Sequence, residues 1–215
     1  MEKEKVLIIR KPIIHKKELK TVSFHALQDD AYFDGVLIKD TKIDSAEAVD
    51  VAIESSTVDG LELPNSKLQG LKLVDVHIEK SDFANSTWEN GFLDRVEISS
   101  SRLTGLKIAE GSFRDVYIKN SKINLSVFRF SKFRNVCFEN CVLTDSDFLE
   151  AKLTNVKFAA CDLSNAEFSH AKFEHVDFSG SKIEGIKINP EQLRGIIIDS
   201  SQVFSVALLM GVIIK

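Results

Sequence analysis

Apolar side chains recur at every fifth position along most of this chain. Steps of five from Phe33 to Ile188 meet an apolar side chain at every position. This period matches neither the 3.6-residue repeat of a helix nor the two-residue alternation of an ordinary strand. The residue two places before each of these apolar centres is usually small or a valine, which indicates that it also faces inward.

Residues that form turns are favoured two places after each centre. Glycine, asparagine or aspartate occupies 19 of the 31 such positions from Gly35 to Gly185. These residues tolerate a positive φ or close a turn with their own side chain. The pattern therefore predicts a corner in the chain at every fifth residue.

A second, longer period indicates how many corners close one coil. Valines two places before an apolar centre recur every 20 residues, which is four five-residue sides. Small residues five places after these valines recur with the same period. The valines are Val76, Val96, Val116, Val136, Val156 and Val176, and the second column is Ser81, Ser101, Ser121, Cys141, Cys161 and Ser181. Stacking of like residues is typical of a solenoid, so four sides make one coil and residues 31–190 make about eight. At a strand spacing of ~4.8 Å, the rod is about 38 Å long.

The repeating unit resembles that of the pentapeptide-repeat family, written A(D/N)LXX. Examples are Ala-Lys-Leu-Thr-Asn at 151–155, Cys-Asp-Leu-Ser-Asn at 161–165 and Ala-Lys-Phe-Glu-His at 171–175. The resemblance covers about three-quarters of the chain and implies an all-β fold, a right-handed four-sided parallel β-helix of about eight coils with a short C-terminal helix. Lysine replaces the usual Asp or Asn at an outward position, which changes surface charge but not fold, at Lys122, Lys132, Lys152, Lys157, Lys172 and Lys182.

Two segments lie outside the repeat. We expect residues 1–30, with the apolar runs Val6–Ile9 and Pro12–Ile14, to form a strand or a cap over the first coil. Asn189 before Pro190 is typical of a helix start, and Gly211 ends the apolar segment that begins at Ser201. Residues 191–215 are therefore predicted to form a C-terminal cap with a short helix.

This tail resembles the C-terminal helix of quinolone-resistance (Qnr-type) and mycobacterial fluoroquinolone-resistance pentapeptide proteins. In those proteins the helix caps the rod and pairs two subunits. The tail here is apolar around most of a helix, so one face can cover the last coil and another is left over. We expect a homodimer with Phe204, Leu208, Leu209 and Met210 at its interface. The alternative is a monomer in which the whole tail packs against its own rod.

Net charge and cysteine content restrict the compartment and the class of partner. The chain carries 32 acidic and 28 basic residues, a net charge of −4, which favours neither a nucleic-acid backbone nor an anionic membrane. Its N-terminus lacks the features of a signal peptide, and no stretch approaches the ~20 apolar residues of a membrane span. Three cysteines do not make a disulfide framework. We expect a soluble cytoplasmic protein that binds neither nucleic acid directly nor a membrane.

Residue types that carry chemistry are present but scattered. His77 is placed outward, while His170 and His175 fall at corners, and the repeat puts no serine or cysteine nucleophile beside them. Cys141 and Cys161 lie one coil apart in an inward column, where buried free thiols are favoured over a disulfide, and further ligands for a metal are lacking. Cys137 is expected to point outward, where it could react, although no basic neighbour favours its thiolate. We predict no catalytic residue, no cofactor and no metal site.

Phenylalanine is mainly a core residue here, because 11 of the 15 phenylalanines occupy apolar centres. Phe92 and Phe130 are exceptions at outward and corner positions, with Leu125 and Leu149 near in the repeat frame. These residues are a candidate surface patch for a partner.

Two functions from different classes fit the sequence. The favoured one is a non-enzymatic scaffold, a rigid rod that binds a protein partner of unknown identity. The alternative, implied by the Qnr-type resemblance, is binding to DNA gyrase or topoisomerase IV by mimicry of a DNA duplex, with possible protection from fluoroquinolones. Sorted by side of the coil, residues 31–190 have acidic-to-basic counts of 6:7, 6:4, 6:4 and 7:4, so no side has the dense negative charge that such mimicry needs.

Overall fold

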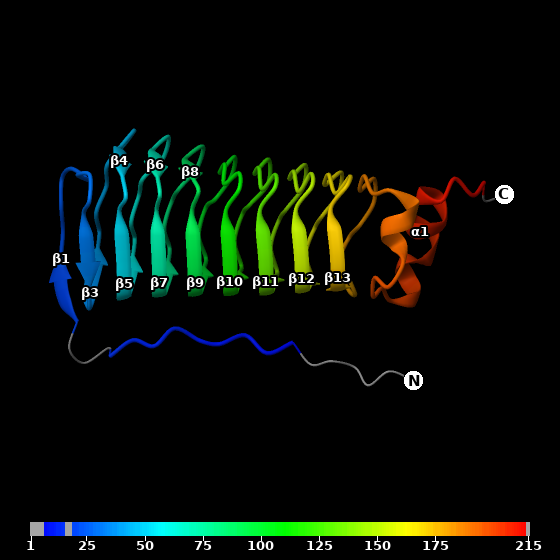
Figure 1. The fold of residues 1–215 in the computed structure, drawn as a ribbon, viewed down its shortest axis with the longest axis horizontal. Coiled ribbons are helices and arrows are strands. Elements are labelled where there is room, and N and C mark those ends of the chain that lie inside the picture. Colours follow the sequence, from blue (N-terminus) through cyan, green and yellow to red (C-terminus); the bar gives the residue numbers. More distant parts are fainter. Residues whose placement is uncertain (1–6, 16–18, 214–215) are drawn as a thin grey trace.

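The computed structural model describes residues 7–15 and 19–213, which form a straight rod of stacked coils (Figure 1). Within this part of the chain, ten strands make one parallel sheet in the order β1-β3-β5-β7-β9-β10-β11-β12-β13, with β2 paired to β5, and β4-β6-β8 make a second sheet. The strands are β1 Lys20–Val22, β2 Tyr32–Asp34, β3 Val36–Lys39, β4 Glu47–Val49, β5 Ala52–Asp59, β6 Lys67–Gln69, β7 Lys72–Glu79, β8 Thr87–Glu89, β9 Phe92–Ser99, β10 Ser112–Lys119, β11 Lys132–Glu139, β12 Lys152–Ala159 and β13 Lys172–Asp177. The 3₁₀ helices η1 Pro190–Leu193 and η2 Ser200–Gln202 precede the helix α1 Val203–Leu209.

Residues of the long strands pair with the residues 20 positions later in the next coil, which is an offset of four five-residue sides. Val96 pairs with Val116, and Val116 with Val136, along the main sheet. The long strands bend around a corner and cover two sides of the coil, while isolated bridges such as Asp82 to Arg102 join coils on another side. The prediction of a parallel β-solenoid of about eight coils is confirmed.

A left-handed backbone conformation marks every corner. Each residue found at steps of five from Asp30 to Gly185 has a positive φ, between 45° and 75°. A Cβ at Gly105 would lie 2.6 Å from Asn85 Oδ1, so a larger residue there would require the Asn85 side chain to move. Leu125 and Phe130 adopt the same conformation, each with a φ of 61°, although their side chains disfavour it.

The apolar centres fill the interior as stacks of like side chains. Phe148 is fully buried, with its ring centroid 5.0 Å from that of Phe128 and 4.8 Å from that of Phe168. Phe138, Phe158 and Phe178 form a second stack with centroid separations of 5.1 and 5.2 Å. These separations match the ~4.8 Å rise of one strand, so each ring lies over its equivalent in the next coil.

Small polar side chains satisfy the backbone inside the rod. Ser101 Oγ accepts from the Ser81 N–H over 3.1 Å and donates to the Ser99 carbonyl over 2.8 Å. Cys141 and Cys161 take the same column position, and both are buried free thiols. The interpretation of these two cysteines as buried thiols is therefore correct.

Glutamine side chains close the C-terminal end of the rod. Gln192 Nε2 donates to the Phe168 carbonyl over 2.9 Å, and Gln202 Nε2 donates to the Phe178 carbonyl over 2.8 Å. In return, the Asp199 carboxylate accepts from the Gly180 N–H over 2.7 Å. Backbone N–H and carbonyl groups of the last coil, which have no further coil to bond, therefore form hydrogen bonds with side chains of η1, η2 and their N-caps.

The N-terminal segment lies in two places. β1 pairs in parallel with β3, and Phe24 and Leu27 pack against the core at the open end. Residues 7–15 instead run back along the outside of the coils (Figure 1), where Arg10 bonds to Asp115. Of residues 1–30, which we expected to form a strand or a cap over the first coil, residues 20–27 lie there. Residues 7–15 lie further along the rod because buried carboxylates bind them, and residues 1–6 and 16–18 are outside the described residues.

Replacement of Phe148 by alanine should lower the free energy of unfolding by about 3–5 kcal/mol, through lost burial and a cavity in the ring stack. Lys152→Ala, at an exposed position one coil side away, should change it by less than about 0.5 kcal/mol. Denaturant melts of the two variants provide the comparison, and equal midpoints would contradict the assignment of inward and outward positions.

Leu125→Asn should raise the free energy of unfolding by an amount on the order of 1 kcal/mol, because asparagine tolerates the left-handed corner better than leucine does. Leu125 is 57% exposed, so little packing is lost. Leu163→Asn, at a fully buried centre, is the opposite control and should destabilise strongly. A lower melting midpoint for Leu125→Asn would show that the corner carries no strain.

Candidate functional site

His77, His170 and His175 lie where the repeat placed them. His170 and His175 are exposed at corners, and His77 is half-buried with no hydrogen-bond partner for its Nε2 atom among the described residues. In residues 7–15 and 19–213, no group of three or more His, Cys, Asp and Glu side chains is arranged to hold a metal ion. No helix of the same residues is long and apolar enough to cross a membrane.

Cys137 lies on the outer face of the coil, as expected, but it is buried there rather than accessible. Its side chain leaves the outer face of β11, but the residue is only 8% exposed and lines a cavity beneath Leu7, Ile9 and Pro12. Burial, with a contribution from Glu139, raises the pKa of Cys137 to about 12. The thiol is therefore protonated and shielded at neutral pH.

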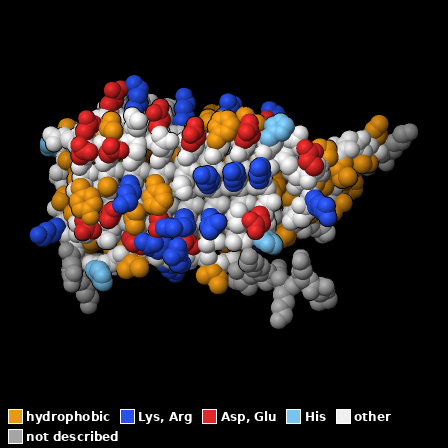
Figure 2. Space-filling view, in the orientation of Figure 1, with side chains coloured by type: hydrophobic (Ala, Val, Ile, Leu, Met, Phe, Trp, Pro, Cys, Tyr) orange, Lys and Arg blue, Asp and Glu red, His pale blue; other side chains and the backbone are white. Residues whose placement is uncertain are grey.

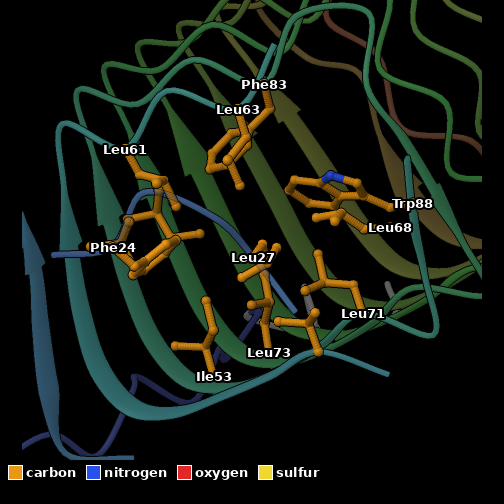
Figure 3. Close-up of a pocket in the computed structure, with 13 residues that line it drawn as sticks. Phe24, Leu27, Ile53, Leu61, Leu63, Leu68, Leu71, Leu73, Phe83 and Trp88 are labelled. Carbon is orange, nitrogen blue, oxygen red and sulfur yellow. The ribbon is translucent and has the colours of Figure 1, made fainter. Parts of the chain in front are cut away.

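A small apolar cavity at the N-terminal end of the rod has too little volume for a ligand. It measures about 20 Å³, and Phe24 and Leu27 share this space with side chains of the first coils, including Leu61 and Trp88 (Figure 3). A volume of this size holds about one water molecule. Binding sites for small molecules are typically about 300 Å³ or more.

Many charged side chains on the coil surface form ion pairs with a neighbouring coil. Lys42 bonds to Glu62 at 2.6 Å, Lys67 to Glu47 at 2.7 Å and Arg129 to Asp147 at 2.6 Å. Each pair links side chains on adjacent coils. Stacking of the coils therefore brings opposite charges together along the rod.

Three lysines that share one column of the main sheet form no such pair with a described residue. Lys132 pairs in register with Lys152, and Lys152 with Lys172, so the three side chains form one exposed column, which we call the lysine row. No carboxylate of the described residues forms an ion pair with them, nor with the exposed Arg134 beside the row. Basic side chains line up over this face in Figure 2. Like charges on adjacent strands are destabilising, so local packing gives no reason for the row.

The predicted surface patch flanks the lysine row. Phe92 occupies the same column, since it pairs with Ser112 and Ser112 pairs with Lys132. Phe130 is 46% exposed at the corner two residues before Lys132. No ring contact joins the two phenylalanines among the aromatic pairs of the described chain, so they are separate apolar points on one charged face.

Of the four residues predicted at a dimer interface, three are exposed to solvent and one faces the rod. Phe204, Leu208 and Met210 are exposed by 66%, 62% and 61%. Leu209 is partly buried and packs with Val206 against the core of the rod. The exposed set is the one available to a partner.

A buried acidic cluster, which the sequence analysis did not identify, lies on the corner between the two sides of the main sheet. Asp94 is 3% exposed and accepts hydrogen bonds from Arg114 Nη2 and Arg95 Nη1, both over 2.6 Å. Asp75 accepts two bonds from Arg95, each over 2.6 Å. The signal in the sequence is the one-coil step from Asp75 to Arg95 and again to Asp115, which places alternating charges in one column.

Comparison with known proteins supports the repeat. Residues 131–206 match the family described as "Pentapeptide repeat region". No curated protein matches the chain in sequence.

Solved structures that resemble the rod are distant in sequence. A trypsin-treated form of QnrB1, a plasmid-mediated fluoroquinolone resistance protein, is 19% identical, with 91% of this chain and 98% of that chain covered and a TM-score of 0.47. HetL, a pentapeptide repeat protein involved in heterocyst differentiation regulation in the cyanobacterium Nostoc sp. strain PCC 7120, is 11% identical, with 79% and 87% covered and a TM-score of 0.37.

The acidic cluster predicts how stability depends on pH. Hydrogen bonds from Arg114, together with the charge of Arg95, hold the pKa of Asp94 below its ordinary value. A carboxylate with a lowered folded-state pKa stabilises the protein above the unfolded value of about 4, and this stability is lost as the pH falls through the folded-state pKa. Urea midpoints should therefore fall as the pH drops below about 4, and less steeply in Asp94→Asn. Parallel declines in the two proteins would contradict the role of Asp94.

Proposed function

Because residues 131–206 match the pentapeptide-repeat family and the five-residue period runs through the whole rod, we propose that this chain is a non-enzymatic rod that binds an acidic surface of a partner protein in the cytoplasm. The observation that carries this proposal is the lysine row, three exposed cations in register that pair with no carboxylate of the described chain. The fold does not require lysine in this column, since Phe92 and Ser112 occupy equivalent positions. Free thiols at Cys137, Cys141 and Cys161 are consistent with a reducing compartment.

The geometry of the row suits a partner with fixed acidic groups. Adjacent lysines are separated by one strand spacing, ~4.8 Å, on a sheet that is rigid because every coil is bonded to the next. Opposite charges on a partner would remove the mutual repulsion and fix the register of the complex. Phe130 and Phe92 supply apolar contacts at the edge of the same face, where aromatic side chains commonly anchor an interface.

We also propose that the rod is a homodimer joined through the exposed side of α1. Phe204, Leu208 and Met210 lie at the end of the rod with Val203, Val212 and Ile213, all of them exposed. A two-fold arrangement buries the same surface on both chains and leaves no open contact for a filament.

The alternative function is binding to a type II topoisomerase, DNA gyrase or topoisomerase IV. It rests on the resemblance of the C-terminal tail and on the proposed dimer. The lysine row and the local ion pairs weigh against DNA mimicry, because a duplex presents only negative charge along its length. Purified gyrase decides between the two: protection from a fluoroquinolone by this protein would favour the alternative, and absence of binding would favour a different partner.

The binding face is tested by removal of its charge. The triple variant Lys132→Gln, Lys152→Gln, Lys172→Gln should lose partners captured by the wild-type protein from its native cell extract, while its melting temperature stays equal or rises. The triple variant Lys39→Gln, Lys107→Gln, Lys122→Gln removes the same charge from exposed positions elsewhere and should retain the partners. Equal capture by both variants would exclude the lysine row as the binding face.

The dimer is tested by light scattering at micromolar concentration. Wild-type protein should have the mass of two chains, and Leu208→Glu should have the mass of one, because a charge cannot be buried unpaired at the interface. Leu208 is preferred to Leu209 for this test since Leu209 also contacts the core. A monomeric wild-type protein would remove the dimer, and a dimeric Leu208→Glu variant would place the interface elsewhere.

A further inference from the structure

The N-terminal residues 7–15, called the strap, lie in a groove on the outside of the coils. Arg10 Nε donates to Asp115 Oδ2 over 2.7 Å, and the Arg10 N–H donates to Oδ1 of the same carboxylate over 3.3 Å. The Ile13 N–H donates to Asp75 Oδ1 over 2.9 Å. Arg10 and Asp115 lie far apart in the sequence, so these contacts hold a distant segment against the rod.

The rod side of the groove contains three buried carboxylates. Asp75 and Asp94 already accept hydrogen bonds from Arg95 or Arg114, and Asp115 has Arg10 of the strap as its cationic partner. Asp115 is 1% exposed, and its carboxylate also accepts from Asn135 Nδ2 over 3.2 Å. Asp94 lies 4.0 Å from Arg10 and Asp75 is 8% exposed, so three buried carboxylates line up along successive coils. A buried carboxylate requires cationic or N–H partners, and an arginine with an extended backbone supplies both.

The strap does not fill this groove. It forms no strand, and Ile8 and Ile13 remain 74% and 61% exposed. A cavity of about 470 Å³ stays between Leu7, Ile9 and Pro12 on the strap and Tyr117, Cys137 and Lys157 on the rod. The groove therefore has room for a larger apolar side chain than the strap provides.

We propose that this groove binds an extended, arginine-bearing segment of a partner protein, and that the strap occupies it in cis until that segment displaces it. The incoming arginine replaces Arg10 at Asp115, and an apolar residue beside it enters the cavity over Tyr117 and Cys137. The strap acts as a tethered competitor, so only a segment that fits the groove better than the strap gains access. This surface and its ligand chemistry are independent of the lysine row.

Cys137 reports whether the strap is in place. In the full-length protein, Arg10→Glu puts a carboxylate against Asp115 and should release the strap, which exposes Cys137 to a maleimide and raises its labelling rate at least about tenfold. Lys122→Glu makes the same charge change at an exposed position on another side of the coil and should leave the rate unchanged. Cys141 and Cys161, inside the rod, should stay unlabelled in every variant and so report intact folding. Ile13→Pro, which removes the N–H bonded to Asp75, provides a second release variant without a charge change.

A nine-residue peptide with the sequence of residues 7–15, Leu-Ile-Ile-Arg-Lys-Pro-Ile-Ile-His, tests the groove as a binding site. By fluorescence anisotropy it should bind full-length Arg10→Glu or Ile13→Pro protein at least about tenfold more tightly than wild-type protein. The same peptide with alanine in place of its arginine should lose about tenfold or more of that affinity. The proposal is overturned if the peptide does not bind the released variants, if the alanine peptide binds equally well, or if Cys137 in Arg10→Glu stays as protected as in the wild-type protein.

Discussion

The left-handed corner after every fifth residue is the constraint on which the whole rod depends. Each corner turns the chain by one side of the coil, so four corners return it to a point one strand spacing further along the axis. The backbone N–H and carbonyl groups of each side then bond to the coils before and after it, and the centres of all coils meet in one core. A corner residue that cannot adopt positive φ would lose these bonds as well as its own conformation.

Because each coil repeats the one before it, every column places similar side chains at one strand spacing. Inside the rod this favours flat rings over rings, as in the stack through Phe148, and serine hydroxyls that bridge adjacent coils. Outside the rod, the charge of a side chain is balanced or opposed mainly by the side chains above and below it in the same column. Where acid and base alternate along a column the surface is neutral, and where they do not, as in the lysine row, like charges repel each other.

The two ends and the strap have no equivalent in the repeat, and each is held by polar groups that reach back to it. Gln192 and Gln202 bond to carbonyls of the final coil, and Arg10 bonds to a carboxylate in the middle of the rod. These contacts join residues that the period of the coil does not relate. Apolar surface stays uncovered at two places, the exposed side of α1 and the partly empty groove beneath the strap.

The sequence by itself determined the period, the number of coils, the residues that face inward and the buried state of Cys141 and Cys161. It could do so because each of these follows from contacts at fixed separations, one side or one full coil apart, and these separations can be counted along the chain. Only the tertiary structure decided the path of residues 7–15, the burial of Cys137 and the division of Leu208 from Leu209 on α1. Those depend on where a non-repeating segment docks on the rod, which is set by the total fit of charge and shape over distant residues, and no local spacing encodes it.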